Sequence, residues 1–406
     1  MTISDVVVEG TVAPGFEGVR AAFEENFRRH GEVGASLGAY VDGEQQVDLW
    51  GGVADAATGQ PWQRDTVSIM YSATKGVVAV LAWMLAQRGQ LDFDAPVPAY
   101  WPEFARGAKA ALPVRYLFTH QAGLPYLDQQ VTREEVLDGR RVVEVLEQQE
   151  PVWEPGTAHG YHAVTYGWLA AELVARVTGR PFRQVLADEI TSVLGLDLHI
   201  GLPSTEAPRV ARLVDWPPPD PSVLESITDP ALKTLVLELA AAMGDPSSTF
   251  TRSLTTNGAL PVPDATIWND PRIYAAEIPA GNGISNGRSL ARMYAATVSE
   301  VGSVRLLTDA TVDKLREEQA SGPDRTLIVP TRFGTGFQQP GPTMPMLSSD
   351  SFGHSGLGGA LGFADPRYRV GFGYVQNQLL ATAATGDPRT IGVVAAIAEA
   401  IGAPPT

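Results

Sequence analysis

The 406 residues of this chain are enough for two structural units that share a large hydrophobic core. With 44% hydrophobic and 19% charged residues the composition is globular, and the formal net charge of −16 argues against nucleic acid and anionic membranes as partners. The absence of cysteine excludes disulfides, thiolate metal sites and a cysteine nucleophile.

Neither the start of the chain nor its apolar runs indicate export or membrane insertion. Residues 1–5 lack the basic stretch and the apolar run of a secretory signal. The longest apolar run, residues 76–86, is shorter than the ~20 residues that a bilayer requires. We therefore expect a cytoplasmic protein that is not inserted in a membrane.

The first part of the chain predicts a helix, a hairpin and a core helix. Apolar residues recur at helical spacing in 16–29, and two strand-like segments, 35–40 and 46–51, flank a turn at 41–44. Residues 77–85 are apolar on every side, which is typical of a helix buried in a core.

The middle of the chain reads as mostly helical. Prolines divide its beginning into short segments, and residues 216–221 form a rigid proline-rich connector. Helices are predicted at residues 133–149, 165–178, 181–193 and 229–243.

The last part predicts a helix at 290–298, strands at 360–364 and 370–377, and a final helix at 389–401. Strands near both ends of the chain, with helices between them, predict one α/β domain made of residues 1–95 and 281–406. A mostly helical domain, residues 96–280, is inserted into it.

Ser72 and Lys75 lie at the N-terminal end of the predicted core helix. Residues three apart lie on the same face of a helix, so the amine stands beside the hydroxyl. A buried amine has a lowered pKa and can accept the serine proton, and the helix N-terminus favours a developing alkoxide. The alternative is an ordinary surface serine and lysine, but a lysine rooted in a core helix needs a reason to be there.

A second candidate is Tyr161, on a loop that opens with Pro155-Gly156-Thr157. A phenolate can act as a general base, but its ordinary pKa of ~10 would have to be lowered by a cation such as Lys75. Alternatively, Tyr161 is simply a packing residue.

A third candidate is the glycine-rich segment 353–366, which begins with His354, Ser355 and Gly356. Glycines permit close approach of a backbone to a ligand, and a strand-edge N–H can bind an oxyanion. Alternatively, the segment is a turn without a ligand.

The sequence argues against two other kinds of site, a nucleophile elbow at Ser285 and a zinc site. Residues 283–287 match Gly-x-Ser-x-Gly around Ser285, but Pro279 interrupts the strand that a nucleophile elbow needs before it. The six histidines show no zinc-binding spacing, and His120 is expected to be structural.

In this order and spacing, Ser72-x-x-Lys75, the Tyr161 loop and His354-Ser355-Gly356 resemble the serine β-lactamase-like superfamily. The likeness spans nearly the whole chain and is greatest to family VIII carboxylesterases and class C β-lactamases. It implies an α/β (α+β) fold, in which helices flank an antiparallel sheet built from both termini and an all-helical domain is inserted. It implies no cofactor and no metal.

The resemblance also assigns roles to residues. Ser72 would be the acylated nucleophile, and Lys75 and Tyr161 the proton-transfer pair, with Tyr161 as the base. His354, Ser355 and Gly356 would bind substrate in place of Lys-Thr-Gly. The backbone N–H groups of Ser72 and Leu357 would form the oxyanion hole.

Two departures from class C β-lactamases favour esters. Ala163 replaces the asparagine that contacts the substrate amide, and His354 replaces the lysine that meets the β-lactam carboxylate. We expect a serine hydrolase acting on small carboxylic esters. The alternatives are β-lactam, D-amino-acid peptide or linear amide hydrolysis, acyl transfer with the same residues, and a non-catalytic binding protein. The sequence does not indicate an oligomeric state.

Overall fold

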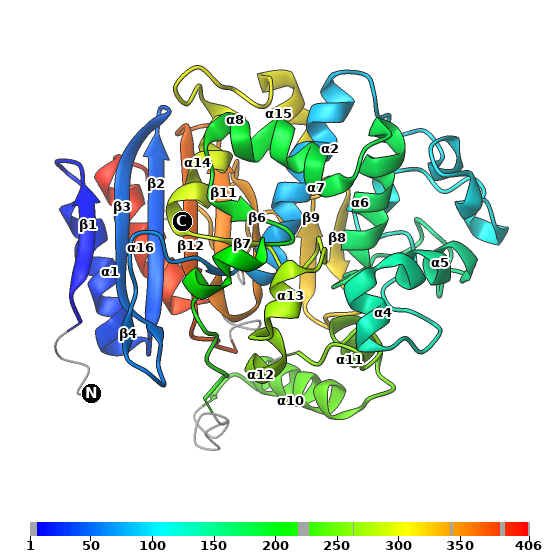
Figure 1. The fold of residues 1–406 in the computed structure, drawn as a ribbon, viewed down its shortest axis with the longest axis horizontal. Helices are drawn as coiled ribbons and strands as arrows, with labels where there is room; N and C mark the ends of the chain where they lie inside the picture. The colour runs from blue at the N-terminus through cyan, green and yellow to red at the C-terminus, as the bar shows by residue number, and fades with distance from the viewer. Residues whose placement is uncertain (1–5, 218–226, 263, 342–343, 382–385, 405–406) are drawn as a thin grey trace.

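The computed structural model describes residues 6–217, 227–262, 264–341, 344–381 and 386–404 (Figure 1). Its main sheet has seven strands in the order β1-β3-β2-β12-β11-β10, with β4 beside β3, and every pairing is antiparallel. The strands are β1 (Val8–Val12), β2 (Gly34–Val41), β3 (Glu44–Asp55), β4 (Gln60–Pro61), β10 (Phe352–Ser355), β11 (Leu361–Asp365) and β12 (Val370–Gln376). The predicted α/β fold, with an antiparallel sheet built from both ends of the chain, is confirmed.

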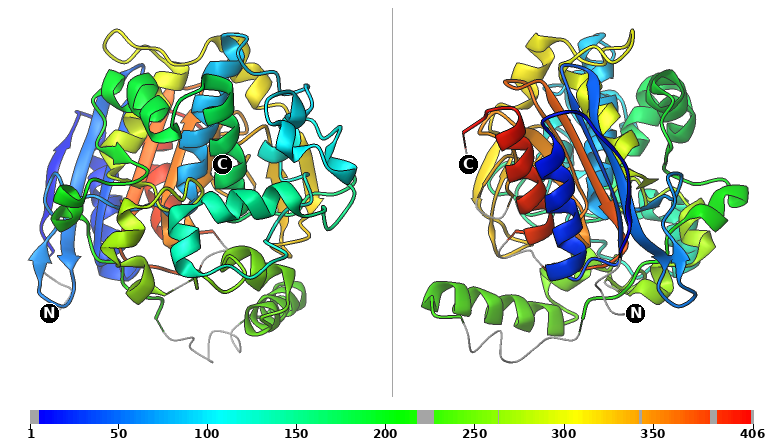
Figure 2. Two further views of the ribbon diagram at one scale, coloured as in Figure 1. Left: turned by 45° about the vertical axis from the view of Figure 1, so that its right-hand side comes forward. Right: turned by 90° about the vertical axis from the view of Figure 1, so that its left-hand side faces the viewer.

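Helices cover both faces of this sheet. Helices α1 (Glu17–Arg29) and α16 (Pro388–Ala400) lie side by side on one face, in blue and red in the right view of Figure 2. Helix α14 (Gly287–Val298) lies on the other face. It packs very close there, since a Cβ at Gly373 would stand 2.4 Å from the carbonyl oxygen of Gly287.

Helix α2 (Thr74–Gln87) is the core helix that the sequence predicted. Every residue from Thr74 to Leu85 is buried. Figure 1 shows α2 between the sheet and the helices of the middle segment. The short 3-10 helix η2 (Tyr71–Ala73) leads into it, so Ser72 lies at the N-terminal end of this buried helix.

The middle of the chain is largely helical. The predicted helix at 133–149 is divided at Gly139, which adopts a left-handed conformation, and the one at 181–193 contains a π-helical turn, η6. The elements are η3 (Val97–Ala99), η4 (Pro102–Phe104), η5 (Gly107–Lys109), α3 (Arg115–Phe118), α4 (Arg133–Asp138), α5 (Arg140–Gln148), α6 (Thr165–Thr178), α7 (Phe182–Leu186), η6 (Ala187–Thr191), α8 (Ser192–Leu194), η7 (Ser204–Arg209), α10 (Pro230–Gly244), α11 (Thr249–Leu254), α12 (Ala265–Trp268) and α13 (Pro271–Ala275).

Two small sheets and a few further elements complete the structure. Strand β6, within the helical middle segment, pairs with β7, which also pairs with β5. The remaining elements are β5 (Ser68–Ile69), β6 (Leu198–His199), β7 (Ile284–Ser285), β8 (Ala320–Pro323), β9 (Pro330–Phe333), α15 (Asp309–Leu315) and η8 (Leu357–Gly359). Residues 218–221 of the predicted connector lie outside the described residues, and the domain boundaries at 95/96 and 280/281 stay a prediction.

In the described part of the chain, no helix is both long and apolar enough to cross a bilayer.

Candidate active site

The structure places the amine of Lys75 against the hydroxyl of Ser72. The two atoms, Nζ and Oγ, are 3.0 Å apart. Ser72 is half-buried, whereas Lys75 is fully buried. Tyr71, immediately before Ser72, has a φ of 42°, and such strain in a non-glycine residue is common at functional sites.

Lys75 has two other partners, and both can only accept hydrogen bonds. Its Nζ lies 2.7 Å from the carbonyl oxygen of Ala163 and 3.0 Å from that of Ala280. The side chain of Asn282 supports the second carbonyl by bridging backbone groups of the loop before it. A neutral amine has two hydrogens and one lone pair. With both hydrogens donated to carbonyls, the lone pair faces the Ser72 hydroxyl.

The surroundings of Lys75 favour this neutral form. Burial holds the pKa of the amine well below its usual value. Lys75 also lies in the first turn of α2, where the positive end of the helix dipole opposes a cation. Lys75 therefore fits the role of a proton acceptor.

Tyr161 lies beside both Ser72 and Lys75. Its hydroxyl interacts with the Ser72 side chain, and its ring is 4.8 Å from Lys75 Nζ. Burial raises the pKa of Tyr161 above its usual value. A phenolate base would need this pKa to be lowered by a cation such as Lys75, and that condition is not met, because the phenol is buried beside an amine that is itself pushed towards neutrality. Tyr161 is thus a protonated phenol, suited to donating a proton.

Two buried residues that no motif indicated hold the Tyr161 loop. Asp324 accepts the backbone N–H of Tyr161 at 3.0 Å. Ser253 donates to the Tyr161 carbonyl at 3.2 Å and accepts the N–H of Ala163 at 3.2 Å. They come from the β8–β9 hairpin and from α11, far from Tyr161 in sequence, so only the fold could reveal them.

Strand β10 brings His354, Ser355 and Gly356 beside η2. A Cβ on Gly356 would stand 2.1 Å from the carbonyl oxygen of Met70, so glycine is required for this approach. Ser355 is held by Gln338, which accepts both its backbone N–H and its hydroxyl, at 2.8 and 3.0 Å.

Leu357 follows as the second residue of a tight turn. Gly359 N–H donates to the Gly356 carbonyl at 3.1 Å, and Gly358 has a φ of 81°, as in a type II turn. In such a turn the N–H of the second residue makes no hydrogen bond within the turn. Among the described groups, neither the N–H of Leu357 nor that of Ser72 donates to another group of the protein. Both are available to a ligand.

His354 is buried and neutral. Its Nδ1 donates to the Ser355 carbonyl at 2.7 Å, which leaves Nε2 as an acceptor. Burial, with a smaller contribution from Lys75, lowers the pKa of His354 to about 3. The position therefore carries no positive charge at pH 7, unlike the lysine that it replaces.

Ser285 is not placed for catalysis. It is fully buried on β7, and its Oγ donates to the backbone carbonyl of Asp197 at 2.9 Å. The structure thus brings together Ser72, Lys75, Tyr161 and the His354 strand, and leaves Ser285 out. Over the part of the chain that can be described, no three His, Asp or Glu side chains are grouped to bind a metal ion.

Comparison with protein families agrees with this arrangement. The sequence profile of the family described as Beta-lactamase matches residues 19–396. The chain belongs to the Beta-lactamase family. Within this family it is 37% identical to the Esterase/beta-lactamase LipL of Mycobacterium tuberculosis, over 92% of this chain and 83% of that protein.

Solved structures give the same assignment. The crystal structure of a family VIII carboxylesterase, 36% identical, superimposes with a TM-score of 0.84 and covers 97% of this chain and 100% of its own. EstA from Arthrobacter nitroguajacolicus, 31% identical, gives a TM-score of 0.82 over 97% of this chain and 98% of its own. Proteins with esterase names are thus similar to this chain over nearly its whole length.

Proposed function

We propose that this protein is a serine carboxylesterase that hydrolyses small carboxylic esters through an acyl-enzyme on Ser72. The observation that carries the proposal is the buried Lys75 amine, whose two carbonyl partners leave its lone pair facing the Ser72 hydroxyl. The esterase names of the family VIII structure, of EstA and of LipL support the same substrate class.

Acylation begins with transfer of the Ser72 proton to the neutral amine of Lys75. The freed oxygen bonds to the ester carbonyl carbon, and the carbonyl π pair moves onto its oxygen. That oxyanion accepts hydrogen bonds from the N–H groups of Ser72 and Leu357. When the intermediate collapses, the bond to the alcohol oxygen breaks. Tyr161 donates its proton to that oxygen and recovers one from the Lys75 ammonium.

Deacylation runs the same transfers with water. Water gives a proton to the oxygen of Tyr161, whose own proton passes to the neutral Lys75, while the water oxygen bonds to the acyl carbon and the carbonyl π pair moves onto its oxygen. The second intermediate collapses, the bond to Ser72 Oγ breaks, and Ser72 Oγ regains its proton from the Lys75 ammonium. Tyr161 therefore serves the leaving oxygen and the incoming water, rather than being the first base that the sequence suggested.

The walls of the site favour neutral esters over β-lactams. A β-lactam carries a carboxylate, and neither Ala163 nor the neutral His354 offers it a charge or an amide. An ester without a carboxylate needs neither group. Because LipL is named both an esterase and a β-lactamase, β-lactam hydrolysis is the second activity to measure.

Kinetics on three substrates test the proposal. We expect kcat/KM for p-nitrophenyl acetate or butyrate to exceed that for a chromogenic cephalosporin and for a p-nitroanilide. Mass spectrometry after treatment with a fluorophosphonate should find one adduct, on Ser72. A protein that is acylated by the cephalosporin but not by esters, or that carries no adduct on Ser72, would contradict it.

A further inference from the structure

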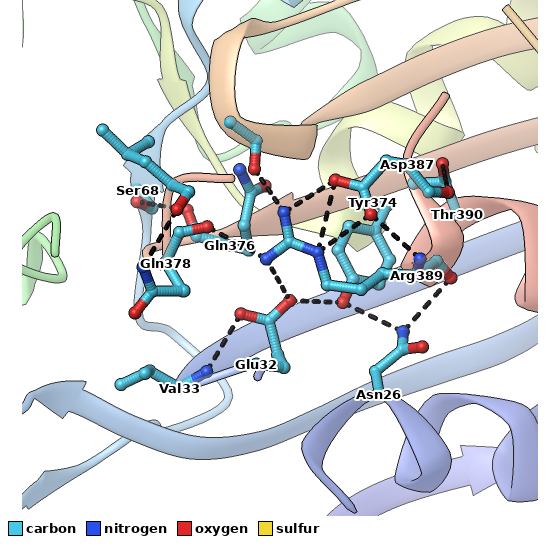
Figure 3. Close-up of polar contacts among 12 residues, drawn as sticks. Asn26, Glu32, Val33, Ser68, Tyr374, Gln376, Gln378, Asp387, Arg389 and Thr390 are labelled. Atoms are coloured by element: carbon cyan, nitrogen blue, oxygen red, sulfur yellow. Dashed lines mark hydrogen bonds and ion pairs between the residues drawn. The ribbon is translucent and has the colours of Figure 1, made fainter. Parts of the chain in front are cut away.

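A fully buried arginine lies directly behind the turn that carries the Leu357 N–H. Arg389, in the first turn of α16, donates to the carboxylates of Asp387 and Glu32 (Figure 3). It also donates to two backbone carbonyls, those of Gln378 at 2.9 Å and of Gly358. Gly358 is the third residue of the turn beside Ser72.

Burying this ion network costs free energy that an apolar side chain in the same space would not cost. The side chains of Arg389 and Glu32 have no solvent exposure, and buried ion pairs seldom stabilise a fold more than apolar side chains of the same volume. Such networks are instead suited to holding one particular arrangement of the groups around them. Here one of those groups is the Gly358 carbonyl, in the turn that carries the Leu357 N–H.

Two peptide groups connect Arg389 to the oxyanion hole. The peptide between Gly358 and Gly359 is held at both ends, since its C=O accepts from Arg389 and its N–H donates to the Gly356 carbonyl. The Gly356 carbonyl and the Leu357 N–H belong to the second peptide group, the one that joins Gly356 to Leu357. In a trans peptide the C=O and N–H point in opposite directions. Fixing the Gly356 carbonyl therefore fixes the direction of the Leu357 N–H.

The same chain of hydrogen bonds passes the polarising effect of Arg389 on to the Leu357 N–H. Hydrogen bonds in a chain polarise one another, most of all in a buried, low-dielectric region. The guanidinium cation draws electron density from the Gly358 carbonyl, which makes the Gly359 N–H a stronger donor. That bond in turn makes the Leu357 N–H a stronger donor.

The packing leaves little room for another arrangement. A Cβ on Gly359 would stand 2.2 Å from Arg389 Nη2 and 2.3 Å from Asp387 Oδ2, so the turn lies directly on the ion pair. On its other side, Gly356 touches the backbone of Met70. The turn is thus held between Arg389 and the segment that carries Ser72.

We propose that Arg389 is a positioning residue of the oxyanion hole, which orients and polarises the Leu357 N–H through the peptides of Gly358 and Gly356. This inference rests on the proposed function, because it takes the Leu357 N–H to bind the oxyanion. It makes a distal, charged, fully buried side chain part of transition-state stabilisation without contact to substrate.

The test compares a p-nitrophenyl ester with its thiono counterpart, in which sulfur replaces the carbonyl oxygen. Sulfur is a weak hydrogen-bond acceptor, so the thionoester reports the nucleophile and base but not the oxyanion hole. Arg389→Lys keeps the positive charge but lacks the guanidinium fork that spans these partners. We expect it to lower kcat/KM for the ester about 10-fold and that for the thionoester less than about 3-fold, since removing one oxyanion donor costs about 10²–10³.

Tyr374→Phe is the matched control. The Tyr374 hydroxyl donates to Glu32 at 2.6 Å and accepts from Asn26 at 3.1 Å, so it belongs to the same network without touching Gly358. It should lower the melting temperature and leave the ester-to-thionoester ratio at the wild-type value. A folded Arg389→Lys with the wild-type ratio, or an equal change of ratio in Tyr374→Phe, would overturn the inference.

Two further results are separable from these. If wild-type protein does not discriminate between ester and thionoester, the oxyanion hole itself is wrongly assigned, and the proposed mechanism fails before the inference does. If Arg389→Lys does not fold, the double variant Arg389→Gln/Glu32→Gln removes one charge of each sign and is subject to the same criterion. Circular dichroism at the assay temperature establishes that each variant is folded.

Discussion

Two lysines of this protein have no solvent exposure, and their surroundings suit them to opposite roles. Lys75 and Lys109 both have no solvent exposure, and each amine contacts two backbone carbonyls. The carbonyls that Lys109 binds belong to Leu146 and Glu147, in the last turn of α5. Lys109 therefore caps the negative end of a helix, whereas Lys75 lies at the positive end of α2.

The charges around the two amines also favour a protonated Lys109 and a neutral Lys75. Burial lowers the pKa of both, but the nearby carboxylates of Glu150 and Glu147 oppose it at Lys109, whose pKa falls only to about 8. For Lys75, burial alone sets the direction of the shift. The third contact of Lys109 is the Phe104 ring, 4.5 Å away, and that of Lys75 is the Ser72 hydroxyl. In the proposed mechanism, Lys109 is therefore a helix cap and Lys75 a base.

The sharpest test of this contrast removes the hydroxyl that only Lys75 contacts. Ser72→Ala should lower ester hydrolysis by about 10⁴-fold or more, because in the proposed mechanism no other group forms the acyl-enzyme. Steady-state assays with p-nitrophenyl acetate measure it. Ser285→Ala, the matched control, should keep its activity and lose only about 1 kcal/mol of stability from one buried hydrogen bond. An inactive Ser285→Ala beside an active Ser72→Ala would reverse the assignment.

Replacing each lysine by methionine separates base from cap. Lys75→Met should lower kcat about 10²–10⁴-fold, as expected for loss of a proton-transfer group. Lys109→Met should keep kcat but lower the free energy of unfolding by about 1–3 kcal/mol, because it leaves two helix-end carbonyls unpaired. Urea denaturation and steady-state kinetics on both variants decide this. Equal loss of activity in the two variants would remove the distinction.

Tyr161→Phe examines how the proton leaves Lys75. The ring is retained and only the donor is lost, so we expect a loss of about 10²-fold in kcat/KM for an ethyl ester. The loss should be smaller for the p-nitrophenyl ester of the same acid, whose leaving group needs no proton. If both esters are slowed to the same extent, Tyr161 does not protonate the leaving oxygen.

The pH dependence of kcat/KM should follow Lys75 and not Lys109. In the proposed mechanism the neutral amine is the active form, so the rate should rise with pH through the lowered pKa of Lys75, up to about tenfold per pH unit on its acid side. Because that pKa lies well below the ordinary value of 10.5, the plateau is reached well before pH 10.5. The profile of Lys109→Met should match that of the wild type. If the profile shifts in Lys109→Met, the pKa of Lys109, and not that of Lys75, governs the rate.

Local patterns were sufficient for some parts of the molecule. The uninterrupted apolar run after Ser72 predicted a buried helix, and α2 is one. Helix α1 and the hairpin of β2 and β3 followed from periodicity and a turn signal. Gly139, by contrast, divides a continuous helical pattern because it adopts a φ of 78°, which the spacing of apolar residues cannot show.

By itself, the sequence determined which chemical groups this protein can use. Ser72 and Lys75 are one helical turn apart, so local geometry sets their contact. Only the tertiary structure decided what those groups do. It buried Lys75 and Tyr161, which sets the directions of their pKa shifts, and it brought Asp324 and Arg389 from distant segments to hold the Tyr161 loop and the turn at Gly358. Burial and long-range hydrogen bonds depend on the packing of the whole chain, which no short motif encodes.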